Sequence, residues 1–245
     1  MISSVPRRLY AGTTIRLQRE PDVAKKQRKS KTIARALEKA AQPTKKSPPS
    51  SGSGVPRQDD TRVMALDLPA ATLSPAMQAY FAKCQEKLGF VPNVLLAYAF
   101  DNAKLEAFAA FYNDLMLAPS GLSKLEREMI AVAVSAQNRC YYCLTAHGAA
   151  VRTYSGDPVL GEMMLMNYRA AKLTRKQRAM LDFAVKMTNE SWAIEEEDRE
   201  ALRRVGFTDR DIWDIAAVAG FFNMSNRVAS ATDMRPNPVY HGQGR

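Results

Sequence analysis

Residues 124–155 have the sequence KLEREMIAVAVSAQNRCYYCLTAHGAAVRTYS, and this stretch indicates the fold class. Apolar residues recur at helical spacing in each half of this stretch, and a polar run at residues 137–139 separates the halves. Ser123 and Glu126 have the spacing of a capping box, which satisfies the free amide groups at a helix start. The stretch therefore predicts two helices, 124–138 and 141–154, that are joined by a tight turn and lie antiparallel.

The same helical period continues on both sides of this helix pair, from about residue 71 to residue 232. No segment of four or more residues alternates convincingly between apolar and polar side chains, as a half-buried strand would. The sequence therefore predicts an all-α body with further helices at 75–88, 94–100, 103–117, 158–167, 175–190, 195–205 and 209–230.

Charge divides the 245-residue chain into two parts. Residues 1–60 hold 14 of the 35 Lys and Arg but 5 of the 25 Asp and Glu, which leaves 21 basic against 20 acidic residues for 61–245. Segments so basic and so poor in apolar residues bury too little surface to fold. We predict a disordered basic extension at 1–60, either a targeting peptide or a wrongly assigned start, followed by one domain at 61–245.

The composition also argues against two classes of partner. The basic extension holds no Phe or Trp on which nucleic-acid bases could stack, and the domain is nearly neutral, so we expect no nucleic-acid partner. No run approaches the ~18 to 20 apolar residues of a membrane-spanning helix, so we expect no membrane partner.

Three residues of the second helix carry reactive chemistry. Cys140, Cys143 and His147 stand at i, i+3 and i+7, so they project from one helix face. Backbone amides at a helix start stabilise a thiolate, which is the nucleophilic form of cysteine. A histidine one turn away can exchange protons near neutral pH. Glu128 borders an apolar run of the preceding helix, where a partner such as His147 would offset the cost of burying its carboxylate.

Cysteine and histidine also occur together in zinc and haem sites. A zinc site at Cys140, Cys143 and His147 would have only three ligands, so we favour no metal. Haem attachment needs a histidine directly after the second cysteine, where this chain has Leu144. We expect Cys84 to pack as a small hydrophobic residue, and we expect no cofactor. Three cysteines without a secretory signal favour a reducing compartment.

With Glu128-x11-Cys140-x2-Cys143-x3-His147 in hand, the sequence resembles the AhpD-like alkylhydroperoxidase superfamily, which includes the carboxymuconolactone decarboxylases. A closer likeness to its uncharacterised peroxidase-related branch lies in LGFVPN at 88–93, FYNDLM at 111–116, LERE at 125–128 and FFNMSNR at 221–227. The resemblance covers residues 62–245 and none of the basic extension.

The resemblance implies an all-helical AhpD-like bundle that assembles through its helices into dimers, trimers or hexamers. It implies that Cys143 attacks the peroxide, that Cys140 resolves the resulting sulfenic acid to a disulfide, and that Glu128 and His147 relay protons. An external thiol donor, a thioredoxin-like or lipoyl-type protein, would then reduce the disulfide. Where well-studied members have a second histidine between the cysteines, this chain has Tyr142, whose hydroxyl can still donate a hydrogen bond to a leaving oxygen.

The expected function is that of a cofactor-independent thiol peroxidase that reduces peroxides, organic hydroperoxides above all. The alternative is a redox-sensing or disulfide-exchange interaction protein with little turnover. We do not expect carboxymuconolactone decarboxylase activity in this chain, because the decarboxylase-like members of the superfamily generally lack the cysteine pair. We expect a cytoplasmic protein, or a mitochondrial matrix protein if residues 1–60 are a transit peptide.

Overall fold

The computed structural model describes residues 62–245, and this part of the chain is helical, as the sequence predicts. No residue within 62–245 lies in a β-strand. The predicted basic extension, residues 1–60, lies outside the described residues. The helices are α2 (Pro75–Leu88), α3 (Asn93–Ala97), α4 (Asn102–Leu117), α5 (Lys124–Gln137), α6 (Tyr141–Ser155), α7 (Pro158–Asn167), α8 (Arg175–Asn189), α9 (Glu196–Arg204) and α10 (Asp209–Ala231).

The helix ends agree with the predicted ranges to within one or two residues, except at α3. The predicted range 94–100 continues three residues past the end of α3. Asp101 explains the difference, because it is extended and its carboxylate accepts a hydrogen bond from the Lys104 amide as the N-cap of α4. The residues before this cap form a turn instead of more helix. Three short 3-10 helices were also not predicted, at Tyr168–Ala170, Ser191–Ala193 and Pro238–His241.

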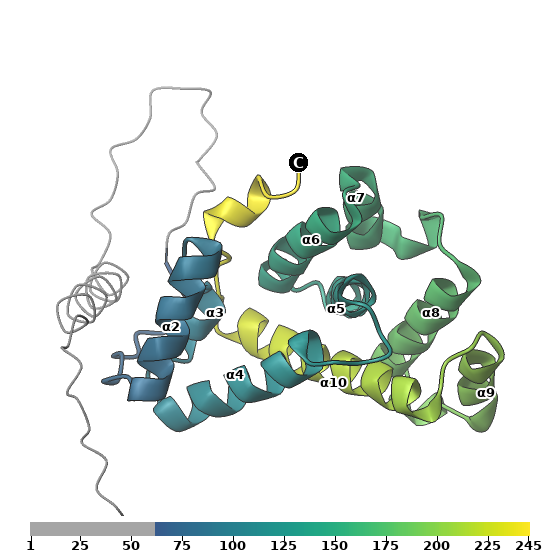
Figure 1. Ribbon diagram of the computed structural model, residues 1–245, viewed down its shortest axis with the longest axis horizontal. Coiled ribbons are helices and arrows are strands. Elements are labelled where there is room, and N and C mark those ends of the chain that lie inside the picture. Colours follow the sequence, from purple (N-terminus) through teal and green to yellow (C-terminus); the bar gives the residue numbers. More distant parts are fainter. Residues whose placement is uncertain (1–61) are drawn as a thin grey trace, which may run out of the picture.

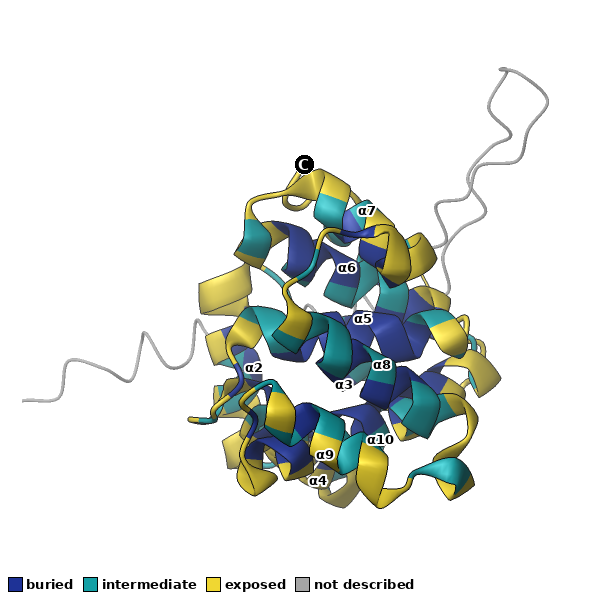
Figure 2. Cartoon of the chain, turned by 90° about the vertical axis from the view of Figure 1, so that its right-hand side faces the viewer, coloured by how far each residue is buried: buried dark blue, intermediate teal, exposed yellow. Residues whose placement is uncertain are grey.

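Helix α5 lies at the centre of the molecule. Every residue from 127 to 135 is buried, so this helix has no solvent-facing side over more than two turns. Figure 1 shows α5 end-on, with α6, α7, α8 and α10 around it, and all four of these helices contact it. The same layering appears in Figure 2, where buried segments gather on the inner helices and exposed segments form the rim. A helix that is mostly apolar on all sides is stable only in such a setting.

The turn between α5 and α6 positions the cysteine pair. Arg139 adopts a left-handed conformation with φ of 53°. The Cys140 amide donates a hydrogen bond of 3.1 Å to the Ser135 carbonyl, which closes the end of α5. The chain then reverses, and Cys140 becomes the N-cap of α6. The predicted tight turn and the predicted place of the cysteines at a helix start are both observed.

The two ends of the described chain meet beside this turn. The Ala65 amide donates to the Thr232 carbonyl and the Arg235 amide donates to the Val63 carbonyl, each over 2.9 Å. Farther along, the Asn93 amide donates to Asn237 Oδ1 at 2.7 Å, so the C-terminal segment is fastened to α3. In Figure 1 this segment runs past α3 toward α6. The chain ends thus lie over the start of α6, where the cysteines are.

The length and apolar character of a helix determine whether it can cross a membrane. Within residues 62–245, no helix combines the length and the apolar character that a membrane span requires.

Candidate redox site

The cysteine pair is buried at the N-terminus of α6. Cys140 and Cys143 are 1% and 2% exposed, and both are free thiols. The Cys143 amide donates a hydrogen bond to the Cys140 sulfur over 3.4 Å, so Cys140 caps its own helix with sulfur in place of the usual oxygen. The spacing i, i+3 therefore brings the two side chains together, as the sequence predicts.

The surroundings of the two sulfurs favour one negative charge on the pair. Interaction with the Cys143 side chain lowers the pKa of Cys140 from 9.0 to about 7, although burial opposes it. The Cys143 amide, the Ser230 hydroxyl and the nearby His147 contribute in the same direction. Because Cys143 interacts with Cys140 and is itself buried, its pKa is raised well above 9.0. When the pair carries one negative charge, these surroundings favour the thiolate on Cys140 and the proton on Cys143.

This charge distribution predicts two separate thiol ionisations in the Cys84→Ser variant. Since a thiolate forms as the pH rises through the thiol pKa, one thiolate is expected to appear with a midpoint at about pH 7. The second is expected only at a pH above the ordinary thiol pKa of 9.0. Ultraviolet absorbance of the reduced protein measures both steps, and Cys140→Ser must remove the lower one. Two thiolates forming together above pH 9 would contradict the geometry.

The predicted carboxylate and imidazole form a second pair one turn away. Glu128 on α5 and His147 on α6 face each other, and Oε2 lies 2.6 Å from Nδ1. Their side chains are only 9% and 12% exposed, respectively. The rings of Phe222 and Tyr112 flank the imidazole, with centroids 4.6 and 6.4 Å away. The cost of burying the Glu128 carboxylate is thus offset by the partner that the sequence suggested.

The two pairs are neighbours without direct contact. His147 lies close enough to lower the pKa of Cys140 through its charge. Within the described part of the chain, however, it makes no hydrogen bond to either sulfur. A proton that moves between a sulfur and the imidazole must therefore pass through a bridging water or follow a small side-chain rotation.

The hydroxyl of Tyr142 is engaged by a backbone amide. The Tyr142 side chain is buried, and its hydroxyl accepts a hydrogen bond from the Val94 amide at the start of α3 over 2.9 Å. Burial raises its pKa well above 10, so the phenol stays protonated. The contact fastens α6 to α3, and a role of this hydroxyl toward a leaving oxygen remains a prediction from the resemblance.

Three polar residues at the sulfurs escaped the sequence analysis. Ser135 on α5 and Asn226 on α10 act to lower the pKa of Cys143, and Ser230 on α10 acts to lower that of Cys140. Ser135 and Asn226 are 0% exposed. A signal was available, since each of these two lies in an otherwise largely apolar helical run where a polar side chain needs a partner.

Apolar side chains complete the enclosure of the cysteines. Met234 is buried against the pair, and Val63 and Met64 pack on the same cluster from the other end of the described chain. A reactant can therefore reach the sulfurs only if it is small or if these covering segments move. The lining favours reactants with apolar groups.

No metal centre forms around these residues. In the part of the chain that the structure describes, no group of three or more His, Cys, Asp or Glu side chains is arranged to hold a metal ion. Cys84 lies apart from the pair, within the main hydrophobic core, and burial raises its pKa. The position of Cys84 in the core is the one that the sequence predicts.

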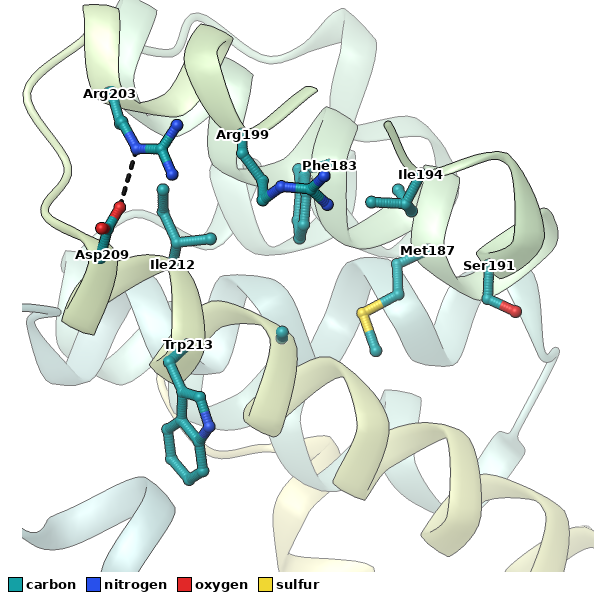
Figure 3. Close-up of a pocket in the computed structure, with 10 residues that line it drawn as sticks. Phe183, Met187, Ser191, Ile194, Arg199, Arg203, Asp209, Ile212 and Trp213 are labelled. Atoms are coloured by element: carbon teal, nitrogen blue, oxygen red, sulfur yellow. Dashed lines mark hydrogen bonds and ion pairs between the residues drawn. The ribbon is translucent and has the colours of Figure 1, made fainter. Parts of the chain in front are cut away.

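An apolar groove elsewhere on the molecule is not part of this site. It lies between α8, α9 and α10, and Figure 3 shows Met187, Ile212 and Trp213 on its walls. The arginine at its edge is already paired, because Arg203 contacts Glu196, Glu200 and Asp209. The groove adjoins the first turns of α10, whereas the sulfurs face the last turns, so it offers the cysteines no substrate pocket.

Comparison with protein families gives one match. The model of the carboxymuconolactone decarboxylase family matches residues 102–158, from α4 through α6. This range contains Glu128, Cys140, Cys143 and His147. No curated protein matches the chain.

Solved structures give longer matches. An uncharacterized peroxidase-related protein from Silicibacter sp. TM1040 is 66% identical, with a TM-score of 0.73, 79% of this chain covered and 100% of that chain covered. A peroxidase-related protein from Ralstonia eutropha JMP134, described as an alkylhydroperoxidase AhpD core, is 45% identical, with a TM-score of 0.72 and coverage of 75% and 97%. The debrominase Bmp8 is 18% identical with a TM-score of 0.59, covers 69% of this chain and 90% of its own, and shows likeness of fold alone.

Proposed function

The chain belongs to the AhpD-like carboxymuconolactone decarboxylase superfamily, in its peroxidase-related branch, and from this premise we propose that it is a thiol-dependent peroxidase. One observation supports this most strongly: a buried dithiol at the start of α6 lies beside the Glu128–His147 pair. The dithiol supplies two electrons and the second pair handles protons, which is what reduction of a peroxide requires.

The first step of the proposed reaction uses the interaction between the sulfurs. Cys143 gives its proton to the Cys140 thiolate and attacks the terminal oxygen of a hydroperoxide. The O–O bond breaks, Cys143 becomes a sulfenic acid, and the alkoxide leaves as an alcohol after taking a proton from the imidazole of His147. Attack by Cys143 follows the family resemblance, and the lowered pKa of Cys140 makes that sulfur a suitable base near neutral pH.

The second step forms the disulfide. Cys140 returns its proton to the Glu128–His147 pair and attacks the sulfenic sulfur of Cys143. The S–S bond forms, the S–O bond breaks, and hydroxide leaves as water after taking a proton from the same pair. Two thiols and one hydroperoxide thus yield one disulfide, one alcohol and one water. An external dithiol, of the thioredoxin-like or lipoyl type, then reduces the disulfide, which requires a reducing compartment.

Catalytic turnover tests this function. A small amount of the reduced protein is mixed with an excess of an organic hydroperoxide and of dihydrolipoamide, and alcohol formation is followed. Many alcohol molecules per chain are expected. Consumption of a single hydroperoxide per chain, whatever dithiol is supplied, would refute a peroxidase that turns over.

One observation favours the second candidate function, a redox-sensing interaction protein. The two ends of the described chain cover the sulfurs with Val63, Met64 and Met234. Oxidation of the dithiol can therefore displace these covering segments. Size-exclusion chromatography of the reduced and oxidised protein tests this function. Different profiles together with a single turnover would support a sensor, and identical profiles would remove its basis.

We also propose that the chain forms homo-oligomers. Large apolar side chains stand exposed on α7 and α10, with Met166 84%, Trp213 57% and Met224 43% exposed. A second copy of the chain would cover such surface. Light scattering at micromolar concentration is expected to give a multiple of the chain mass, and a monomer would refute the proposal.

A further inference from the structure

Two uncharged side chains face the Cys143 sulfur from different helices. Ser135 on α5 and Asn226 on α10 are close enough to this cysteine to lower its pKa, and both are 0% exposed. They also bind each other, because Asn226 Nδ2 donates to Ser135 Oγ over 2.9 Å. We propose that Ser135 and Asn226, called the donor pair below, bind and stabilise the thiolate of Cys143 during peroxide attack, an inference that rests on the proposed peroxidase function.

The orientation of the Asn226 amide leaves an N–H group for the sulfur. Asn138 Nδ2 donates to Asn226 Oδ1 over 3.0 Å, so the amide oxygen is already engaged away from Cys143. The amide nitrogen carries two hydrogens. One is donated to Ser135, and the other is left for the sulfur.

The Ser135 hydroxyl is a donor by the same reasoning. Its oxygen accepts from Asn226, so its own hydrogen can be donated to the neighbouring Cys143 sulfur. Hydroxyls in the middle of helices commonly bond the carbonyl four residues earlier, as Thr145 and Thr188 do here. Ser135 makes no such bond within the described residues, although it is part of α5. Its hydroxyl is therefore available to the sulfur.

The donor pair offsets the free-energy cost of forming a buried thiolate in the proposed reaction. A thiolate on Cys143 would be buried, and the titratable groups around it are Cys140 on the turn and His147 and Tyr142 on α6. From α5 and α10, the groups that act to lower the pKa of Cys143 are the two neutral side chains of the donor pair. Hydrogen bonds to a charged group are stronger than those between neutral groups, so two donors lower the barrier to forming this thiolate.

Asn223 supplies a matched control one turn earlier on α10. It accepts a hydrogen bond from the same Asn138 amide over 3.0 Å and donates to Thr188 Oγ1, also over 3.0 Å. No contact joins it to either sulfur within residues 62–245. A residue that only holds α10 against its neighbours should behave like Asn223, whereas a sulfur donor should not.

The test measures the pKa of Cys143 alone, in the full chain with Cys84→Ser and Cys140→Ser. Ultraviolet absorbance gives the thiolate fraction as a function of pH. Ser135→Ala, which removes one oxygen, is expected to raise this pKa by about one unit. At a pH below the pKa, the rate of reaction with an organic hydroperoxide is expected to fall about tenfold. Asn226→Leu should act in the same direction, and Ser135→Thr, which keeps the hydroxyl, should restore the lower pKa.

Asn223→Leu should leave the pKa of Cys143 unchanged. An unchanged pKa in Ser135→Ala, or an equal shift in Asn223→Leu and Asn226→Leu, would overturn the inference. If Asn226→Leu fails to fold, Ser135→Ala still decides. The peroxidase proposal fails separately: a raised pKa in a protein whose Cys143 never reacts with hydroperoxide would refute that proposal and leave the donor pair in place.

Discussion

Replacement of Cys143 by serine is expected to reduce hydroperoxide turnover to background, a loss of roughly a thousandfold or more. Serine keeps the size of the side chain and its ability to donate a hydrogen bond to Cys140, so the fold and the resting thiolate should survive. What disappears is the sulfur that accepts oxygen. Steady-state alcohol formation with a hydroperoxide and dihydrolipoamide measures the loss, and Cys84→Ser, in the hydrophobic core, is the matched control with normal turnover.

Cys140→Ser separates the roles of the two sulfurs. It should also stop turnover, because no disulfide can form, yet one sulfenic acid per chain should accumulate on Cys143. This sulfenic acid should form more slowly than in the parent protein, since the thiolate that takes the Cys143 proton is gone. A sulfenic-acid trap followed by mass spectrometry locates the label. A label on Cys140 in the Cys143→Ser variant would reverse the assigned roles, and normal turnover in both variants would refute the dithiol centre.

Glu128→Gln is expected to lower turnover about a hundredfold while the protein stays folded. Glutamine has the same shape, and its carbonyl can still accept the hydrogen bond from His147 that now spans 2.6 Å. The variant loses only the negative charge that allows the pair to take up and release a proton. Single-turnover kinetics should show slower disulfide formation with unchanged stoichiometry, because the dithiol itself is intact.

Glu197→Gln provides the control for this change, since Glu197 is an exposed carboxylate on α9, away from the dithiol. Its turnover should equal that of the parent protein. Equal turnover in Glu128→Gln as well would show that the buried ion pair is structural, and the proposed proton relay would then be wrong.

The fold was predictable because helical periodicity and local capping signals agree along the chain. Ser123 and Thr174, for example, each begin a helix with a capping box at the expected place. The shorter α3 was not predictable in the same way. Its end depends on the cap of the next helix at Asp101, and apolar residues continue past it.

The candidate site was only half predictable, for a physical reason. Cys140, Cys143 and His147 belong to one helix and its cap, so their spacing alone places them together. The position of Glu128 beside them can be predicted once a tight turn is expected at Arg139. Ser135 and Asn226 meet across a long-range contact between α5 and α10, and although each needs a polar partner in its apolar run, no local pattern specifies which one. Met234 and Met64 cover the cysteines, and their positions likewise depend on how the two ends of the described chain meet.

The account rests on the oxidation of one dithiol by one peroxide, and the most direct measurement counts both. The reduced Cys84→Ser protein is mixed with one equivalent of cumene hydroperoxide, and free thiols, alcohol and cross-linked peptides are then quantified. We expect both thiols to be lost rapidly, with one alcohol formed for each Cys140–Cys143 disulfide. Thiols that survive, or a disulfide that forms without alcohol, would contradict a peroxidase centre at the start of α6.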